Sequence, residues 1–177
     1  MHFLIRPAQS SDAAHIAHVH VESWKTTYSG IVSADYLASL DEPARAQSWH
    51  QAIEEATATF FVAQQEPDPS DPSGIFGFIA GGPIRDPADG YDAELYAIYL
   101  LTQNQHNGAG RALVRTLASS LHAKGLNSII VWVLEANPAV DFYKRLGAVP
   151  VTKKTINIGG QDLSDLALGW PSLDLLL

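Results

Sequence analysis

Apolar residues recur along this chain with two kinds of spacing, and their alternation predicts its secondary structure. Short runs rich in β-branched and aromatic residues predict strands, over residues 2–8, 57–64, 74–84, 93–102, 127–135, 148–160 and 161–170. Apolar residues three and four apart, with capping residues at the ends, predict helices, over residues 10–30, 33–40, 42–56, 109–124 and 137–147. The resulting order is one strand, three helices, three strands, then helix, strand, helix and two strands, which indicates a mixed α/β sheet.

The predicted strands differ in their expected environment. The first meets Pro7, which is typical of an edge strand because proline cannot donate a hydrogen bond to a neighbouring strand. The strand over 93–102 is strongly apolar, so we expect it to be buried on both faces. The strands over 57–64 and 74–84 read as a hairpin with a long connection. The proline-rich part of that connection, residues 66–73, has no role that the sequence reveals.

The first predicted helix has an apolar face and a polar face. The apolar face carries Ala13, Ile16, Ala17, His20 and Trp24, and the polar face carries Ser11, His15, His18, Glu22 and Lys25. His15 and His18 lie one turn apart, but a metal needs a further converging ligand, so we expect solvated side chains and no metal site. His20 lies on the apolar face, where we expect it either to be buried in the core or to border a substrate pocket.

Composition and charge limit the class of protein. The chain has 177 residues, 46% of them hydrophobic, which fits one globular domain over residues 1–177. It has no cysteine, which excludes a disulfide framework, a thiolate metal site and a thiol nucleophile and makes the cytoplasm the expected compartment. The formal net charge of −8 argues against nucleic acid and anionic membranes as partners. The apolar run over residues 3–5 is too short for a signal peptide or a membrane span.

A glycine-rich loop precedes the fourth predicted helix, at Gly108 and Gly110. It is interpreted in one of three ways: as a turn that only starts a helix, as a dinucleotide-binding loop, or as another kind of phosphate cradle. The dinucleotide motif needs a third glycine where Leu113 stands, a tighter approach from the strand, and more chain after Glu135 for a second half of the sheet. No nucleotide-triphosphate P-loop pattern occurs.

The cradle interpretation agrees with more of the chain. Residues 105–112, QHNGAGRA, match the pattern Gln-x-x-Gly-x-Gly/Ala, which resembles the GCN5-related N-acetyltransferase (GNAT) superfamily. Residues 93–117 resemble its central strand, loop and helix. Residues 137–148 resemble its second cofactor segment, with Ala139 one position early, and residues 3–37 its N-terminal strand and acceptor-side helices. Independently of the name, backbone N–H groups at a helix N-terminus bind anions, and Arg111 and Arg115 add positive charge.

This resemblance implies a fold, a cofactor and its binding residues. The fold would be a mixed, mostly antiparallel, splayed central sheet with helices on both faces. The cofactor would be acetyl-CoA as co-substrate, with no metal. The residues expected to bind it are Ile98, Tyr99, Leu100, Gln105, His106, Asn107, Gly108, Ala109, Gly110, Arg111, Asn137, Ala139 and Phe142. Asn137 has the additional, compatible role of a helix cap before Pro138.

The expected reaction is acetyl transfer to a primary amine of a small molecule or peptide, by direct attack in a ternary complex. Tyr143 is the expected general acid for the leaving thiolate, with core packing as its alternative role. Glu94 is the expected base, directly or through water, and a solvated strand end is the alternative. Trp24 and Tyr28 are expected to line the acceptor pocket or to pack in the core.

Two other functions fit part of the sequence. A non-catalytic CoA-binding sensor would share the cradle, and a dinucleotide-dependent oxidoreductase would bind NAD(P) instead. The sequence leaves open the identity of the amine, a homodimer, and whether the apolar C-terminal residues 173–177 form an interface or pack on their own domain.

Overall fold

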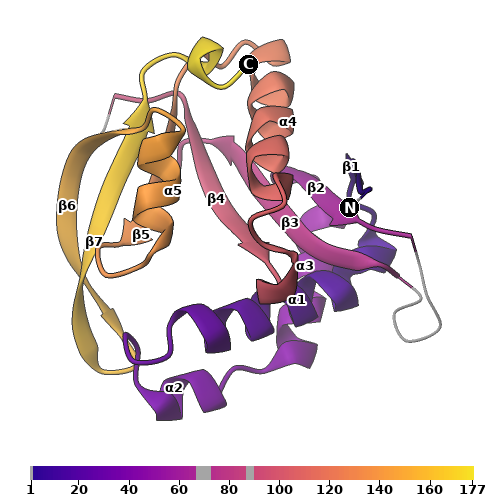
Figure 1. Cartoon of the computed structure of the whole chain (residues 1–177), viewed down its shortest axis with the longest axis vertical. Coiled ribbons are helices and arrows are strands. Elements are labelled where there is room, and N and C mark those ends of the chain that lie inside the picture. Colours follow the sequence, from indigo (N-terminus) through magenta and orange to yellow (C-terminus); the bar gives the residue numbers. More distant parts are fainter. Residues whose placement is uncertain (1, 67–72, 87–89) are drawn as a thin grey trace.

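The structure is a computed structural model that describes residues 2–66, 73–86 and 90–177. In these residues the strands form one seven-stranded sheet in the order β1-β2-β3-β4-β5-β7-β6 (Figure 1). The strands are β1 (Leu4–Pro7), β2 (Thr59–Gln64), β3 (Ile75–Pro83), β4 (Ala93–Leu100), β5 (Ile129–Leu134), β6 (Val149–Ile158) and β7 (Gln161–Trp170). Each predicted strand is present with its ends shifted by a few residues, and β1 lies at the sheet edge as Pro7 predicts. Most of the proline-rich segment, residues 67–72, lies outside the described residues.

The helices also follow the predicted order. They are α1 (Ala13–Thr27), α2 (Ala34–Ala38), α3 (Glu42–Glu54), α4 (Ala109–Ala123) and α5 (Ala139–Arg145). The side chain of Ser33 accepts a hydrogen bond from the N–H of Tyr36 at the start of α2. The side chain of Asp41 accepts a hydrogen bond from the N–H of Ala44 at the start of α3. These caps satisfy backbone donors that have no partner within the helix, which is why the helices begin there. None of these helices is long and apolar enough to cross a membrane, as far as the chain is described.

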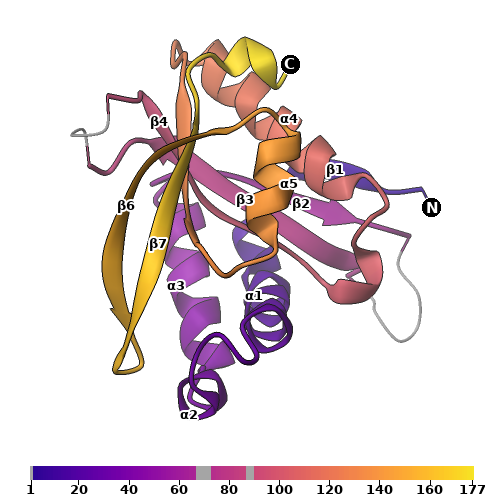
Figure 2. The same cartoon turned by 60° about the vertical axis from the view of Figure 1, so that its left-hand side comes forward.

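Helices cover both faces of the sheet, as the resemblance implies. On β3, Ile79 packs against α4 and α5, whereas its neighbours Phe78 and Ala80 pack against α1 and α3. Successive strand residues point to opposite faces, so one strand supports two core layers. Figures 1 and 2 show α4 and α5 together on one face and α1 and α3 on the other. The layers hold the sheet between two sets of helices.

The C-terminal apolar residues pack on their own domain. Leu173 is fully buried and Leu176 is partly buried against the α4 layer of the core. Leu175 and Leu177 stay exposed. The sequence alone left this arrangement and an interface as alternatives, and the contacts favour intramolecular packing.

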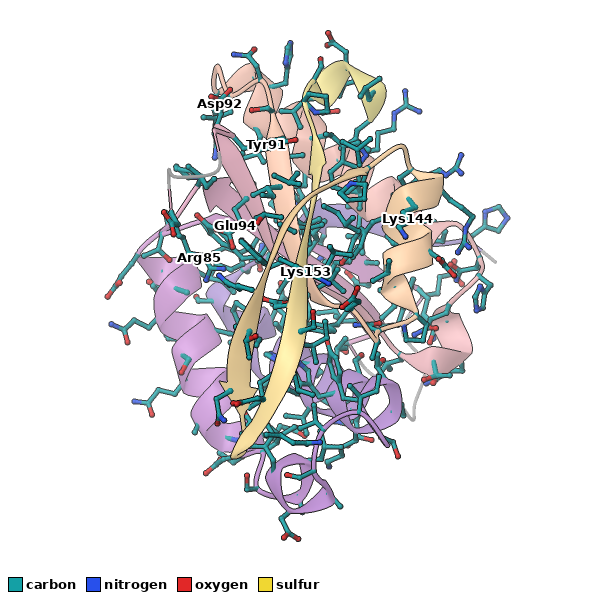
Figure 3. All side chains as sticks on the ribbon, turned by 90° about the vertical axis from the view of Figure 1, so that its left-hand side faces the viewer. Arg85, Tyr91, Asp92, Glu94, Lys144 and Lys153 are labelled. Carbon is teal, nitrogen blue, oxygen red and sulfur yellow. The ribbon has the colours of Figure 1, made fainter. Side chains whose placement is uncertain are left out.

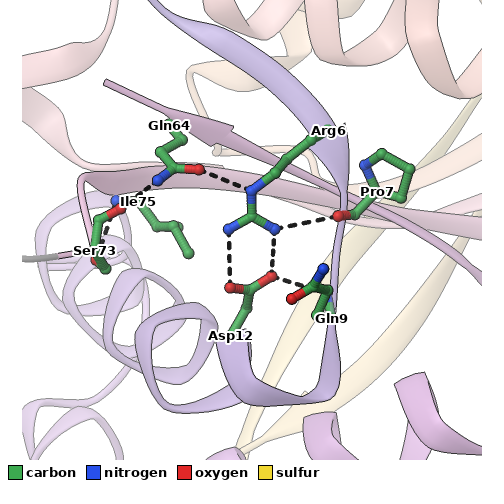
Figure 4. A network of polar contacts seen from close by, with 7 residues as sticks. All are labelled: Arg6, Pro7, Gln9, Asp12, Gln64, Ser73 and Ile75. Atoms are coloured by element: carbon green, nitrogen blue, oxygen red, sulfur yellow. Dashed lines mark hydrogen bonds and ion pairs between the residues drawn. The ribbon is translucent and has the colours of Figure 1, made fainter. Parts of the chain in front are cut away.

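A polar network fixes β1 to the segment before α1 (Figure 4). The guanidinium of Arg6 donates to both carboxylate oxygens of Asp12, at 2.6 and 2.9 Å. It also donates to the side chain of Gln64 on β2 at 2.7 Å. Burial raises the pKa of Asp12, but the hydrogen bonds from Arg6 and the N–H of Gln9 outweigh it, and the pKa lies below its ordinary value. The network therefore holds the N-terminal edge of the sheet where α1 begins.

Candidate active site

The two central strands separate partway along their length. β4 and β5 are parallel and pair only over Ala93–Leu95 and Ile129–Val131, although β4 continues to Leu100. On its other side β4 pairs with β3 nearly throughout, but the register shifts next to Tyr96, which is the extra residue of a bulge. A bulge bends a strand and increases its twist. Beyond Leu95, the edge of β4 that faces β5 therefore has backbone groups free of a strand partner.

A cavity of about 770 Å³ occupies the space between these strands. It is lined from one face of the sheet by Val131 and Val133 and from the other by Trp132. Tyr96 and Leu95 repeat this alternation on β4. Because neighbouring residues of a strand point to opposite faces, a cavity that touches both sets passes through the sheet. Two molecules can therefore enter it from opposite faces and meet between the strands.

The glycine-rich loop closes one end of this cavity. Gly108, with a φ of 91°, is the N-cap of α4, and this left-handed conformation favours glycine. The Asn107 side chain accepts from the N–H of Ala109 at 3.0 Å. The N–H groups of Gly110 and Arg111 form no hydrogen bond within the described chain. Free N–H groups at a helix N-terminus, together with the helix dipole, make this end of the cavity an anion site.

Arginines surround the same helix end. Arg111, Arg115 and Arg145 line a second cavity of about 270 Å³ beside the first, and Arg111 and Arg145 line both. None of them has a counter-ion among the described residues. In a chain with a net charge of −8, three unpaired cations next to the loop form a local positive field suited to several phosphates.

Tyr143 lies in the cavity wall on the same side as the loop. Its ring is 5% exposed and packs edge to face on Trp170, with centroids 6.1 Å apart. Its hydroxyl forms no hydrogen bond within the described residues, and Tyr143 lines the cavity. Burial, followed by the nearby Tyr99, raises the pKa of Tyr143 above its ordinary value. The side chain is thus a neutral phenol with a free O–H in the cavity.

Two side-chain hydrogen bonds join α1 and its C-cap residue Tyr28 to other parts of the cavity wall. Asn137, just before α5, donates to the hydroxyl of Tyr28 at 3.0 Å. Trp24 donates through Nε1 to the hydroxyl of Tyr99 at 3.0 Å. The side-chain oxygen Oδ1 of Asn137 accepts a hydrogen bond from the N–H of Ala139, so Asn137 also caps α5. These bonds tie the acceptor-side helix to the segment expected to bind the cofactor.

Glu94 lies outside the cavity lining. It is 3% exposed, and its carboxylate is bound by the guanidinium of Arg85, whose Nε donates at 3.1 Å. The backbone N–H of Arg85 also donates to it at 3.3 Å. Figure 3 shows Glu94 and Arg85 side by side. The structure thus does not bring this predicted base to the cavity where Tyr143 lies.

Most of the other predicted site residues do line the cavity between β4 and β5. The lining includes Tyr28, Ile98, Tyr99, Leu100, Gln105, His106, Gly108, Gly110, Arg111, Asn137, Ala139 and Phe142. Asn107, Ala109 and Trp24 are not among the lining residues. Ala109 is buried in the core and donates its N–H to Asn107, and Trp24 donates to the hydroxyl of Tyr99. Gln105 donates to the carbonyl of Leu100, so it braces the loop against β4.

Several lining residues had no signal in the sequence analysis. They are Ser23, Thr26, Thr27, Leu95, Tyr96, Ala97, Thr102, Val131, Trp132, Val133, Pro138, Arg145 and Leu146. Trp132 and Val133 belong to β5, and only the separation of β4 from β5 brings them to the site. No group of three or more His, Cys, Asp or Glu side chains that could hold a metal occurs within the ranges that the structure describes.

Comparisons with known proteins agree with this geometry. The family model described as "Acetyltransferase (GNAT) family" matches residues 19–148. A curated Bacillus subtilis (strain 168) protein, "Uncharacterized N-acetyltransferase YuaI", is 42% identical over 172 residues, covering 97% of this chain and 95% of the relative. The PaiA N-acetyltransferase of Thermoplasma acidophilum, solved with coenzyme A, is 25% identical, with a TM-score of 0.71 and coverage of 94% and 98%.

A second solved structure has the same fold. The putative acetyltransferase yncA of Salmonella typhimurium, solved with acetyl-CoA, is 19% identical, with a TM-score of 0.71 and coverage of 98% of this chain and 95% of that one. The resemblance seen in the sequence and the predicted fold class are both confirmed. The chain belongs to the acetyltransferase (GNAT) family and is an acyltransferase.

Proposed function

We propose that this protein transfers the acetyl group of acetyl-CoA to a primary amine, with both substrates bound at once. The observation that carries the proposal is a cavity that passes through the sheet between β4 and β5, with an anion site at one end. Cofactor and acceptor enter from opposite faces, and the acetyl group is exchanged where the strands separate.

The cofactor side is supported by charge and by relatives. The free N–H groups of Gly110 and Arg111 point to a diphosphate, and the neighbouring arginines neutralise it. Structures of similar fold hold coenzyme A in one case and acetyl-CoA in another. The free edge of β4 from Ile98 to Leu100 offers backbone groups to the pantetheine arm and to the acetyl oxygen, where such donors stabilise developing charge.

Tyr143 supplies the proton for the leaving thiolate in this proposal. A thiol has an ordinary pKa of about 8.5 and a tyrosine of about 10, so transfer of the proton costs roughly 2 kcal/mol before tuning. Tyr143 is protonated at neutral pH, which is the form a general acid needs, and its raised pKa adds to this cost in the unliganded protein. The amine attacks the acetyl group directly, since the chain has no cysteine to form a thioester.

Glu94 remains the predicted base, and its position sets a condition on that role. Its carboxylate is held by Arg85 outside the cavity lining, so a proton from the amine reaches it only through water. A pH–rate profile of Glu94→Gln tests this directly. Loss of the acidic limb supports the role, and an unchanged acidic limb removes Glu94 from the mechanism.

Ligand binding and turnover together test the function. Acetyl-CoA is expected to raise the melting temperature of the protein, because a ligand that binds only the folded state stabilises it by mass action. NAD(P)H is the control and is expected to give no shift. An amine panel assayed by thiol release then separates enzyme from sensor: binding without transfer to any amine indicates the sensor. A shift with NAD(P)H and none with millimolar acetyl-CoA contradicts the proposal.

A further inference from the structure

One backbone carbonyl on the free edge of β4 is held by side chains from two different parts of the chain. The carbonyl of Leu100 accepts a hydrogen bond from Oγ of Ser23 on α1, at 3.2 Å, and another from Nε2 of Gln105, in the segment before α4, at 3.1 Å. All three residues line the cavity. The end of β4 is therefore fastened both to the acceptor-side helix and to the segment expected to bind the cofactor.

This carbonyl faces the gap between β4 and β5. The C=O of Leu100 and the N–H of Leu101 belong to one planar trans peptide group, in which they point in opposite directions. The N–H of Leu101 donates to the carbonyl of Phe76 on β3 at 2.9 Å, so the carbonyl of Leu100 points away from β3, to the side where β4 has no strand partner. In an extended strand the N–H and C=O of one residue point to the same edge, so the N–H of Leu100 faces the gap as well.

The hydroxyl of Ser23 bonds outside its own helix. A serine or threonine inside a helix can donate to the carbonyl four residues before it, as Thr26 does to Glu22 at 2.9 Å. Ser23 lies on the buried face of α1, is 2% exposed, and donates to the strand instead. A hydrogen bond is stronger in such a buried place than at the surface, where the bond from Gln105 lies. Ser23 is therefore the firmer of the two holds on Leu100.

We propose that Ser23 is a positioning residue for the acetyl transfer. By holding the carbonyl of Leu100, it fixes the direction of the neighbouring backbone N–H groups on the free edge of β4, which the proposed function assigns to the pantetheine arm and the acetyl oxygen. Donors that are fixed before the reaction stabilise the charge that develops on that oxygen. The inference rests on the proposed function and adds a residue that acts through β4 without touching the reacting atoms.

Ser23→Ala tests this role by a split between turnover and binding. The variant loses one donor to Leu100, and kcat for the best amine of the panel is expected to fall about fivefold or more, because displaced donors weaken the transition state. The dissociation constant of acetyl-CoA is expected to change less than about threefold, since the N–H groups of Gly110 and Arg111 stay in place. Ser23→Thr keeps the hydroxyl and is expected to restore about half of the wild-type kcat or more.

Isotope-edited infrared spectroscopy measures the donors at the acetyl oxygen directly. Acetyl-CoA that is isotope-labelled at the thioester carbonyl is expected to show a lower carbonyl stretching frequency when it binds the wild-type protein, because hydrogen-bond donors polarise the C=O bond. Ser23→Ala is expected to reduce this shift, and Ser23→Thr to restore it. The measurement needs no amine, so it decides the role of Ser23 even when the panel contains no acceptor.

Ser48→Ala is the matched control. Ser48 is exposed on α3, donates to Ala44 within its own helix at 3.0 Å and lies outside the cavity lining, so kcat and the carbonyl stretch are expected to stay as in the wild type. If Ser23→Ala lowers only the melting temperature and leaves kcat and the carbonyl stretch unchanged, the bond is merely structural and the proposal is wrong. An equal loss of kcat in Ser48→Ala also contradicts it. Failure of the proposed function is distinct, because then acetyl-CoA does not bind to the wild-type protein.

Discussion

At the residue scale, the site combines aromatic hydroxyls that differ in how they are held. The hydroxyl of Tyr28 accepts from Asn137, and that of Tyr99 accepts from Trp24. Only the hydroxyl of Tyr143, among these three tyrosines, has no side-chain partner in the described chain. A hydroxyl that is already bound serves to fix the wall, whereas a free one is available to a substrate. This difference is the reason to assign proton transfer to Tyr143.

Replacement of Tyr143 by Phe tests that assignment. The variant keeps the ring packing on Trp170 and loses only the O–H, so kcat is expected to fall more than tenfold, consistent with the usual contribution of about 10²–10⁴ from general acid catalysis. The dissociation constant of acetyl-CoA is expected to change little. Steady-state kinetics and calorimetry measure both. Tyr91→Phe, outside the cavity lining, is the control, and an unchanged kcat in Tyr143→Phe removes the residue from the mechanism.

At the element scale, the loop before α4 depends on close approach between two helices. A Cβ atom at Gly110 would lie 3.3 Å from the ring of Phe142 on α5. This is tighter than ordinary van der Waals contact, so α4 and α5 reach their spacing because position 110 has no side chain. The spacing sets the width of the cavity end where the free N–H groups lie.

Gly110→Val is therefore expected to weaken cofactor binding selectively. The branched side chain pushes against Phe142 and covers the N–H groups, and we expect the acetyl-CoA dissociation constant to rise at least tenfold, about 1.4 kcal/mol. Calorimetry measures the change, and circular dichroism verifies that the fold is kept. Ser119→Val, on an exposed position of the same helix, controls for β-branching. Equal affinities of the wild type and Gly110→Val would show that this helix end does not bind the cofactor.

At the scale of the whole molecule, a buried histidine links the fold to pH. His20 is 6% exposed and lies between the rings of Trp49 and Tyr99. Its Nδ1 accepts from Trp49 at 3.3 Å, while Nε2 is the one buried side-chain polar atom in the described chain with no partner. Burial, and then the charge of Arg45, lower its pKa to about 3. The sequence left burial and a place at the acceptor pocket as alternatives, and His20 is buried.

This pKa predicts a loss of stability in acid. The unfolded chain binds a proton at His20 below its ordinary pKa of about 6.5, whereas the folded chain stays neutral down to about 3. The free energy of unfolding therefore falls as pH falls from 6.5 towards 3, by up to about 1.4 kcal/mol per pH unit from this group.

His20→Phe is expected to flatten that dependence. Urea unfolding at pH 7 and pH 4.5 gives, for each protein, the difference in free energy of unfolding between the two pH values. The effect of losing the Trp49 hydrogen bond is the same at both and cancels in this difference. His15→Gln, on the exposed face of α1, is the control and should keep the wild-type slope. A wild-type slope in His20→Phe would mean that His20 titrates normally in the folded state.

The local elements were predictable because each is encoded by neighbouring residues. Leu113, Leu117 and Leu121 repeat at helical spacing and are all buried in α4. The glycine-rich loop before α4 was predictable for the same reason, since Gly108 and Gly110 act through the backbone of their own segment. Glu94 shows the limit: its place at the start of β4 was foreseen, but its partner Arg85 lies on a different segment, and no local pattern pairs them.

The sequence by itself determined the order of helices and strands, the amphipathic faces, the glycine-rich loop before α4 and the family, because short segments of the chain encode each of these. Only the tertiary structure decided which residues share the cavity. The separation of β4 from β5 brings Trp132 and Val133 to the site from opposite faces of the sheet. This placement depends on pairing between strands far apart in the chain, and a shift of one residue would turn each side chain to the other face.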